Sequence, residues 1–344
     1  LNVFRYITFR SIGGAVTAFL IVLFLGQFFI RAMRHYQIGQ VVRDDGPETH
    51  LAKQGVPTMG GLLILAAITI GTLLWARLDN SLVWLGLFVT LFYGCIGSID
   101  DLRKIRKNNS KGLSGKWKLI LQFLGASVVG VVIYWNSGFD GHLSLPFLKN
   151  FRPDLGWFYV VFAIIVIVGA SNAVNLTDGL DGLAVGPTVV TAAVYLVFSY
   201  LAGHVVLAEY LQLTYVAGSG ELAVFCGTIF GACLGFLWFN AYPAQMFMGD
   251  VGSLAIGGAL GSIAIIIKQE FLLAIVGGVF VMEALSVIMQ VGYFKMTRGK
   301  RIFLMAPFHH HFEKKGWHEP KVVVRFWIVS IILGLVAIAT LKLR

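Results

Sequence analysis

The chain has 344 residues, of which 57% are hydrophobic and only 13% charged, and its formal net charge is +10. Its mean hydropathy is +0.80. Soluble domains carry about 25% charged residues, so this composition excludes a disordered chain, a disulfide scaffold and a soluble nucleic-acid-binding protein. We therefore predict an all-α integral membrane protein that forms a single polytopic domain over residues 1–344.

Apolar runs recur along the whole chain. A helix that crosses the hydrocarbon core of a bilayer requires about 20 mainly apolar residues. Ten runs meet this requirement, at about 13–32, 59–76, 82–99, 119–135, 157–174, 183–202, 222–239, 253–267, 271–290 and 324–341.

Lys and Arg are distributed unevenly between the predicted loops. Loops after odd-numbered spans hold nineteen of these residues, and loops after even-numbered spans hold four. Cytoplasmic loops are enriched in Lys and Arg, so we expect both termini outside, in the periplasm. The predicted cytoplasmic loops are about 33–58, 100–118, 175–182, 240–252 and 291–323. The clustered carboxylates lie in the same loops, which predicts an active site on the cytoplasmic face.

Two adjacent carboxylates, Asp100 and Asp101, end the third predicted span and precede a basic run. Adjacent carboxylates repel each other, which favours a shared cation or proton. Hard oxygen ligands beside basic groups are typical of a magnesium–phosphate site. A solvated helix end within a basic loop explains the same residues equally well.

Polar residues recur every three positions after the fifth span, at Asn172, Asn175, Asp178 and Asp181. On a helix they would form one slowly turning polar stripe. Polar groups at the end of an apolar span usually mark function. The alternative is a loop built from turn-forming Asn, Asp and Gly.

A third segment, 239–253, holds Asp250 among aromatic and small residues. Phe247 can stack on a planar base, and Asn240 can hydrogen-bond a base edge or a ribose. Asp250 can also serve simply as the N-cap of the next helix, a role that is compatible with metal binding.

Three consecutive histidines, His309, His310 and His311, lie in the last long basic loop. They cannot share one helical face as the ligands of an H-E-x-x-H zinc site do, and no thiolate or second spaced pair supports zinc. On a bent loop they can donate hydrogen bonds to phosphate oxygens. A surface histidine cluster is the alternative.

Four further features are weaker. Lys53 can contact phosphate, and the Gly60–Gly61 pair permits close packing against another helix. Gln290 can contact a base or a sugar. Glu283 lies inside the ninth predicted span and requires a partner, but the sequence assigns it no role.

Five motifs carry a resemblance that covers essentially the whole chain. They are P-T-M-G-G (57–61), D-D-L-R-K (100–104), N-L-T-D-G-L-D-G-L (175–183), F-M-G-D-V-G-S (247–253) and P-F-H-H-H-F-E (307–313). This set resembles the bacterial phospho-N-acetylmuramoyl-pentapeptide-transferase family, in the polyprenyl-phosphate N-acetylhexosamine-1-phosphate transferase superfamily. The triple histidine favours this family over relatives that use UDP-N-acetylglucosamine.

The resemblance implies transfer of phospho-MurNAc-pentapeptide from UDP-MurNAc-pentapeptide to undecaprenyl phosphate, giving lipid I and UMP. It also implies dependence on Mg²⁺, a homodimer in the bilayer of the bacterial cytoplasmic membrane, and no nucleic-acid partner. The implied acidic catalytic group is Asp100, Asp101 and Asp250, with Asp250 a magnesium ligand and Asp100 and Asp101 further candidates.

The resemblance also implies two sets of substrate-binding residues. The nucleotide-sugar pocket comprises Asn175, Asp178, Asp181, Asn240, Phe247 and Gln290, with Asn172 a further candidate. The phosphate or uridine region comprises Lys53, Lys116, His309, His310 and His311. Two alternatives stay open, namely a sister transferase that uses UDP-N-acetylglucosamine and a secondary transporter. The transporter fits less well because its ionisable residues would gather near the bilayer midplane, and a membrane-anchored scaffold fits least.

Overall fold

The computed structural model describes residues 2–36, 39, 53, 55–107, 112–135, 141–148 and 151–342. Most of the first predicted cytoplasmic loop, 33–58, therefore lies outside the described residues. Within the described residues there are two isolated β-bridges but no β-strand. The helices are Asn2–Arg5 (η1), Ile7–His35 (α1), Gly61–Trp75 (α2), Ser81–Lys107 (α3), Gly115–Tyr134 (α4), Phe158–Thr177 (α5), Val185–Ala202 (α6), Val205–Leu211 (α7), Gly220–Asn240 (α8), Gly249–Ile266 (α9), Glu270–Val276 (α10), Gly278–Met296 (α11), Phe308–Lys314 (α12) and Glu319–Ala339 (α13).

Nine of the helices in the described part of the chain are long and apolar enough to cross a membrane. They confirm the apolar character of nine of the ten predicted spans. The remaining span, predicted at 59–76, corresponds to α2, which has only 15 residues. Met59 has a positive φ of 64°, so the helix begins after it. The amides of Gly60 and Gly61 are bonded to the carbonyls of Phe247 and Met248 instead.

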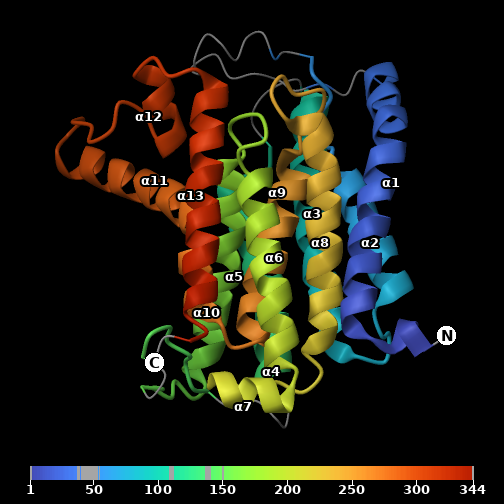
Figure 1. Ribbon diagram of the computed structural model, residues 1–344. Helices are drawn as coiled ribbons and strands as arrows, with labels where there is room; N and C mark the ends of the chain where they lie inside the picture. Colours follow the sequence, from blue (N-terminus) through green and yellow to red (C-terminus); the bar gives the residue numbers. More distant parts are fainter. Residues whose placement is uncertain are drawn as a thin grey trace.

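The prediction of one continuous span over 271–290 is wrong, because the chain breaks there into α10 and α11. The break lies at Gly277, which caps both helices. Glycine has low helix propensity, and a Cβ on the adjacent Gly278 would lie 2.8 Å from Leu333 of α13. After the break, α11 runs obliquely away from the other long helices (Figure 1).

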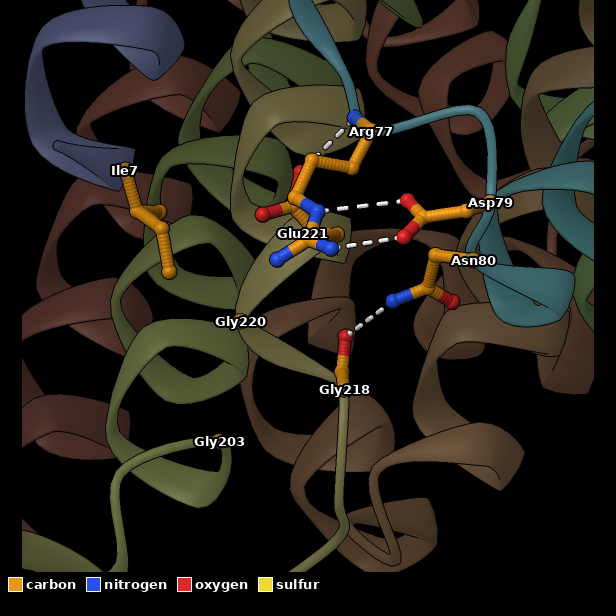
Figure 2. A pocket seen from close by; sticks show the side chains of 8 residues that line it. All are labelled: Ile7, Arg77, Asp79, Asn80, Gly203, Gly218, Gly220 and Glu221. Carbon is orange, nitrogen blue, oxygen red and sulfur yellow. Dashed lines mark hydrogen bonds and ion pairs between the residues drawn. The ribbon is translucent and has the colours of Figure 1, made fainter. Parts of the chain in front are cut away.

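The two ends of the bundle differ in character. Figure 1 shows both chain termini at one end and α12 at the opposite end. The end with the termini contains a pocket of about 360 Å³ (Figure 2). Glu221 in this pocket accepts hydrogen bonds from the Arg10 guanidinium at 2.5 and 2.6 Å and from the Arg77 amide at 3.0 Å. These paired groups stabilise the packing of α1, α2 and α8, and they lie far from the motifs of the predicted active site.

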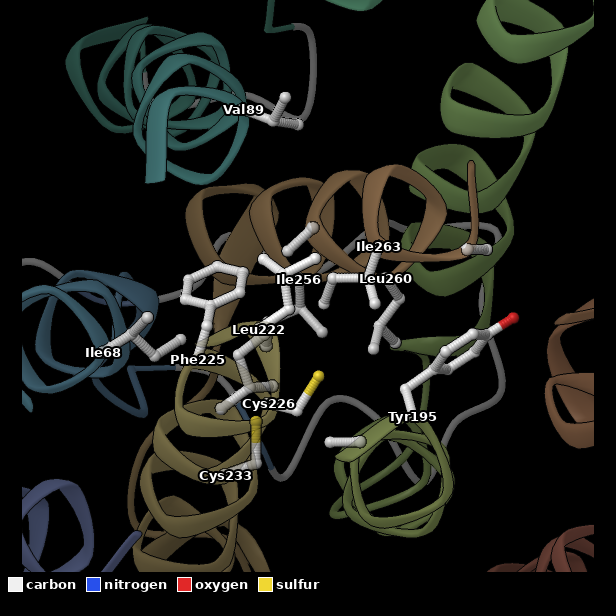
Figure 3. Close-up of a cluster of buried hydrophobic side chains, with 14 of the residues drawn as sticks. Ile68, Val89, Tyr195, Leu222, Phe225, Cys226, Cys233, Ile256, Leu260 and Ile263 are labelled. Atoms are coloured by element: carbon white, nitrogen blue, oxygen red, sulfur yellow. The ribbon is translucent and has the colours of Figure 1, made fainter. Parts of the chain in front are cut away.

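The core is built around α9, whose residues Val251–Ile266 are all buried. Small residues let its neighbours approach closely. A Cβ on Gly257 would lie 2.6 Å from the Ala170 carbonyl oxygen of α5. Ile256, Leu260 and Ile263 of α9 pack with side chains from α2, α3, α6 and α8 (Figure 3). The buried central helix therefore packs against α3 and α5, whose ends carry predicted catalytic residues.

Candidate active site

Three carboxylates from two helices meet at the end of the bundle that carries α12. Asp100 and Asp101 lie near the end of α3 and are buried, and Asp250 is partly buried in the first turn of α9. One oxygen from each lies within 4.8 Å of the others. The two helices are in close contact, since a Cβ on Gly97 would lie 2.2 Å from the Asp250 carbonyl oxygen. This three-carboxylate cluster unites the residues that the sequence predicted as the acidic catalytic group.

Two lysines offset much of the negative charge of the three-carboxylate cluster. Lys104 Nζ lies 2.6 Å from Asp100, 3.1 Å from Asp250 and 3.4 Å from Asp101. Lys118 Nζ lies 2.6 Å from Asp250. In the sequence, both lysines were recognised only as members of a basic loop. The i,i+4 spacing of Asp100 and Lys104 is nevertheless a local signal for the ion pair between them. Lys116, which we predicted instead, is exposed.

Backbone amides also donate hydrogen bonds to the carboxylates of the cluster. Asp101 Oδ2 accepts a hydrogen bond from the Val251 amide at 3.1 Å, and Asp100 Oδ1 accepts one from the Leu113 amide at 2.8 Å. Gly249 precedes these contacts with a φ of +73°, and a Cβ there would lie 2.6 Å from Asp101 Oδ2. The motif glycine is therefore needed both for its backbone angle and for the space that it leaves.

The predicted polar stripe is divided between a helix and a turn. The helix α5 ends at Thr177, so only Asn172 and Asn175 are helical. Asn175 Nδ2 donates to Asp250 Oδ1 at 3.0 Å, whereas Asn172 Nδ2 donates to Gln122 Oε1 at 2.8 Å. Of these two asparagines, Asn175 therefore contacts the three-carboxylate cluster and Asn172 contacts α4.

Asp178 begins the turn after α5. Its carboxyl makes no hydrogen bond or ion pair with another residue in the described part of the chain. Burial in the site, together with the negative charges of Asp250, Asp101 and Asp181, raises its pKa from the ordinary value of 3.8 to about 8. A carboxyl without a protein partner beside the cluster is available to a ligand.

Asp181 lies in a second charged group with Lys53 and Glu319. Lys53 Nζ is 2.6 Å from Asp181 Oδ1 and 2.5 Å from Glu319 Oε1. Glu319 also accepts the Asp181 amide at 2.8 Å, and Asp181 Oδ2 accepts the Ala244 amide at 2.9 Å. The sequence missed Glu319, which belongs to no motif and is recognisable only as an acid in the first turn of α13.

Asn240 connects two loops of the site. Its Oδ1 accepts the Gly182 amide at 3.1 Å, and its Nδ2 donates to the Met246 carbonyl at 2.9 Å. Phe247 follows in the same loop and is partly buried, with its amide bonded to the Pro57 carbonyl at 2.8 Å. These contacts hold the segment that carries Phe247 beside the start of α2.

The Gly60–Gly61 pair confirms the predicted close packing. A Cβ on Gly61 would lie 2.2 Å from the Gly252 amide nitrogen of α9, and one on Gly60 would lie 2.8 Å from the Phe247 carbonyl oxygen. The start of α2 therefore rests directly on the backbone of the Asp250 segment.

The three histidines lie on the short helix α12, so the expectation of a bent loop is wrong. His309 is fully buried. His310 Nδ1 lies 2.6 Å from Glu313, and His311 Nδ1 accepts the Leu304 amide at 3.1 Å. The rings of His309 and His310 lie together, with centroids 4.1 Å apart, whereas the His311 ring stacks on Phe308.

Gln290 supports the loop between α11 and α12. Its Oε1 accepts the Ile302 and Phe303 amides, each at 3.0 Å, and its Nε2 donates to the Phe303 carbonyl at 3.1 Å. The structure therefore places it against this loop, with all of these contacts made to backbone.

Comparison with known proteins identifies the class that this fold and site represent. The Glycosyl transferase family 4 profile matches residues 83–268, which cover α3 from its third residue, all of α5 and α9, and hence the whole three-carboxylate cluster. The chain is thus a membrane-embedded glycosyl transferase in class.

Relatives that match over the full length of the chain identify the family within this class. The chain is 78% identical over 343 residues to the phospho-N-acetylmuramoyl-pentapeptide-transferase of Desulfotalea psychrophila. It is 60% identical over 343 residues to the proteins of that name from Syntrophus aciditrophicus and Pelobacter propionicus. Each comparison covers 100% of this chain and 96% of the relative. The chain therefore belongs to the phospho-N-acetylmuramoyl-pentapeptide-transferase family, which confirms the resemblance drawn from its motifs.

Proposed function

We propose that the protein transfers phospho-MurNAc-pentapeptide from UDP-MurNAc-pentapeptide to undecaprenyl phosphate, with lipid I and UMP as products. This is the first membrane step of peptidoglycan synthesis. The observation that carries the proposal is the three-carboxylate cluster with its two lysines, set at the end of an apolar helix bundle in a chain of this family. A soluble anionic nucleotide and a lipid phosphate can meet at such a place.

The three-carboxylate cluster fits a magnesium ion. Three hard oxygen donors lie within 4.8 Å of one another, and Mg²⁺ prefers carboxylate ligands. The Lys104 ammonium lies within 3.4 Å of all three carboxylates, and this shared positive partner supports the proposal that the cluster binds a cation. We propose Asp250 as the principal ligand, with Asp100 and Asp101 as further candidates. When bound, Mg²⁺ would neutralise charge on the pyrophosphate oxygens.

The reaction exchanges one pyrophosphate bond for another. An oxygen of the lipid phosphate attacks the β-phosphorus, a new P–O–P bond forms, and the bond to UMP breaks. Phosphoryl transfer depends mainly on positioning and charge neutralisation, which Lys104 and Lys118 can provide. We favour this one-step route, in which Asp100 accepts a proton from the lipid phosphate, over a two-step route through an aspartyl phospho-enzyme.

The nucleotide-sugar pocket is proposed around the same cluster. Asn175 and Asp178 are best supported. Asn175 contacts Asp250, and the pKa of Asp178, which has no partner among the described residues, is raised by burial and by the charge of Asp250. Asp181, Asn240 and Phe247 belong to the loops beside them. Lys53, Lys116, Asn172, Gln290 and the three histidines stay proposals that rest on the motif resemblance.

The placement in the membrane is part of the same proposal. We place the carboxylate end on the cytoplasmic face of the bacterial inner membrane because the basic loops follow the odd-numbered spans. Basic groups there would attract anionic substrates. A homodimer is proposed on the motif resemblance alone.

The experiment that tests the reaction compares two sugar nucleotides. Detergent-solubilised protein with Mg²⁺ and undecaprenyl phosphate should release UMP from UDP-MurNAc-pentapeptide and not from UDP-N-acetylglucosamine. Release only from UDP-N-acetylglucosamine would indicate the sister transferase. No release from either, by protein shown to be folded, would contradict the proposal. A stoichiometric burst of UMP without the lipid would favour the two-step route.

A further inference from the structure

Glu283 is a carboxylate with no exposed surface, placed within the apolar helix α11. A charged group at such a position is costly unless it has a partner. The partner in this structure is His309 of α12. Both Glu283 oxygens face the first turn of α12, and Oε2 lies 3.2 Å from His309 Nδ1. Glu283 therefore connects α11 to α12 at the point where α11 leaves the bundle.

The contact also caps α12. The first amides of a helix have no acceptor within the helix, and Pro307 at the N-cap provides no side-chain hydrogen bond. Glu283 supplies the missing acceptor, since its Oε1 and Oε2 lie 3.2 and 3.4 Å from the His309 amide nitrogen. One carboxylate thus accepts the backbone amide of His309 and also contacts its imidazole at 3.2 Å, so it restrains both parts of the residue.

The opposite edge of the His309 ring rests on the turn that carries Asp178. Both ring nitrogens of His309 are buried without a hydrogen bond within the described ranges, so Nδ1 makes only the 3.2 Å ion-pair contact with Glu283 and Nε2 faces the turn. A Cβ on Gly179 would lie 2.3 Å from this nitrogen, so only glycine leaves room for the ring. The ring is fully buried among Glu283, Gly179 and the His310 ring, whose centroid lies 4.1 Å away, so a ligand cannot reach it without a change in the protein.

We propose that Glu283 and His309 are positioning residues for the nucleotide-sugar pocket. Glu283 holds the His309 ring, and the ring holds the turn from Gly179 to Asp181, next to Asp178. The identity of the ligand in this inference rests on the function proposed above. His309 then acts through the turn, in place of the phosphate contact that the sequence predicted for it.

A double-mutant cycle with UMP as the probe tests this chain of contacts. In Glu283→Gln, one of the two carboxylate oxygens becomes an NH₂ group. A single acceptor oxygen is then left for both the backbone amide and the Nδ1 edge of His309. Loss of a residue that orients a site residue typically costs about 10- to 100-fold, so we expect UMP to bind at least about tenfold more weakly. Gly179→Ala should give a similar loss. The double variant should be no weaker than the weaker single variant, because both changes displace the same turn.

Matched histidine variants locate the important edge of the ring. His309→Asn keeps a donor near the position of Nδ1, whereas His309→Gln keeps one near Nε2. We expect His309→Asn to retain more UMP affinity than His309→Gln. Kinetics of UMP release should also be compared between wild-type protein and Glu283→Gln. We expect the variant to have a higher KM for the nucleotide sugar, with a smaller proportional decrease in kcat.

The control is Glu270→Gln, another buried carboxylate, which is hydrogen-bonded to Tyr159 near the far end of the bundle. It should leave UMP affinity unchanged. Additive losses in the cycle, wild-type affinity in Glu283→Gln, or better binding by His309→Gln would overturn the inference. Failure of the wild-type protein to bind UMP would instead overturn the proposed function together with this inference.

Discussion

At the scale of single residues, the site concentrates negative charge that an apolar bundle tolerates only with compensation. Asp100, Asp101 and Asp250 share Lys104, and Lys118 adds a second positive charge at Asp250. Asp178 has no such partner in the described part of the chain. The pKa of Asp178 is raised because its carboxyl is buried and nearby negative charges are not offset there. The protonation of Asp178 therefore responds to the charge in the site.

Asp178→Asn should reduce the loss of stability at alkaline pH. The raised pKa means that between pH 3.8 and about 8 folded protein keeps a proton that unfolded protein has released. Stability from the protonated group is therefore complete below pH 3.8 and is lost as pH rises through about 8. Without Mg²⁺, the wild-type melting temperature should fall between pH 5 and pH 9 by several degrees more than that of the variant.

Thermal melts in detergent provide this measurement. Asp79→Asn is the control, because Arg77 lowers the pKa of that exposed carboxyl, so its charge does not change between pH 5 and pH 9. Parallel pH profiles for wild-type protein and Asp178→Asn would show that the Asp178 pKa is not raised.

Site residues could be predicted from the sequence only where they belong to a motif. The three aspartates were predictable because adjacent carboxylates and an isolated acid at the ends of apolar runs are unusual in a membrane protein. Lys118 was not distinguishable from Lys116, because its contact with Asp250 joins residues 132 positions apart. Glu283 could be recognised as needing a partner, but only the fold brings His309 to it.

At the scale of helices, apolar length predicted most spans because hydropathy is a local property of the chain. The break at Gly277 was missed, since a glycine inside an apolar run is often tolerated. Its cause is partly tertiary, in the contact of Gly278 with α13. The end of α5 at Thr177 was likewise hidden, because a three-residue polar repeat suits both a helix and a series of turns.

Gly97→Ala should separate α3 from α9 and impair both stability and catalysis. The added Cβ would meet the Asp250 carbonyl oxygen at 2.2 Å, so the backbone must move and the carboxylates must change their spacing. Overpacking of this kind costs about 1–3 kcal/mol. The melting temperature should fall by several degrees, and UMP release should fall at least about tenfold.

Gly169→Ala is the matched control for Gly97→Ala. It lies within α5, where nothing is within 4 Å of an added Cβ, and alanine favours the helix by up to about 1 kcal/mol. Its stability and activity should equal or exceed those of the wild type. If Gly97→Ala behaved like Gly169→Ala, the close contact of α3 and α9 would not control the site.

At the scale of the whole molecule, one buried helix organises both the bundle and the site. The apolar length of α9 anchors the core, and its first turn carries Asp250. The ends of α3 and α5 meet around that turn, and Asn240 at the end of α8 is bonded to the turn after α5, all away from both chain termini (Figure 1). The resulting arrangement sets charged chemistry at the end of an apolar bundle, as a reaction between a soluble nucleotide and a membrane lipid requires.

The most direct measurement is UMP release from UDP-MurNAc-pentapeptide and undecaprenyl phosphate by wild-type protein and Asp250→Asn, over a titration of Mg²⁺. We expect release by the wild type to require Mg²⁺ and to stop with EDTA. Asp250→Asn should stay folded by its melting temperature and lose at least about 10²- to 10³-fold in kcat, since it loses the carboxylate proposed as the principal magnesium ligand. Release by Asp250→Asn within tenfold of the wild type, at the same Mg²⁺ concentration, would contradict the role of the three-carboxylate cluster.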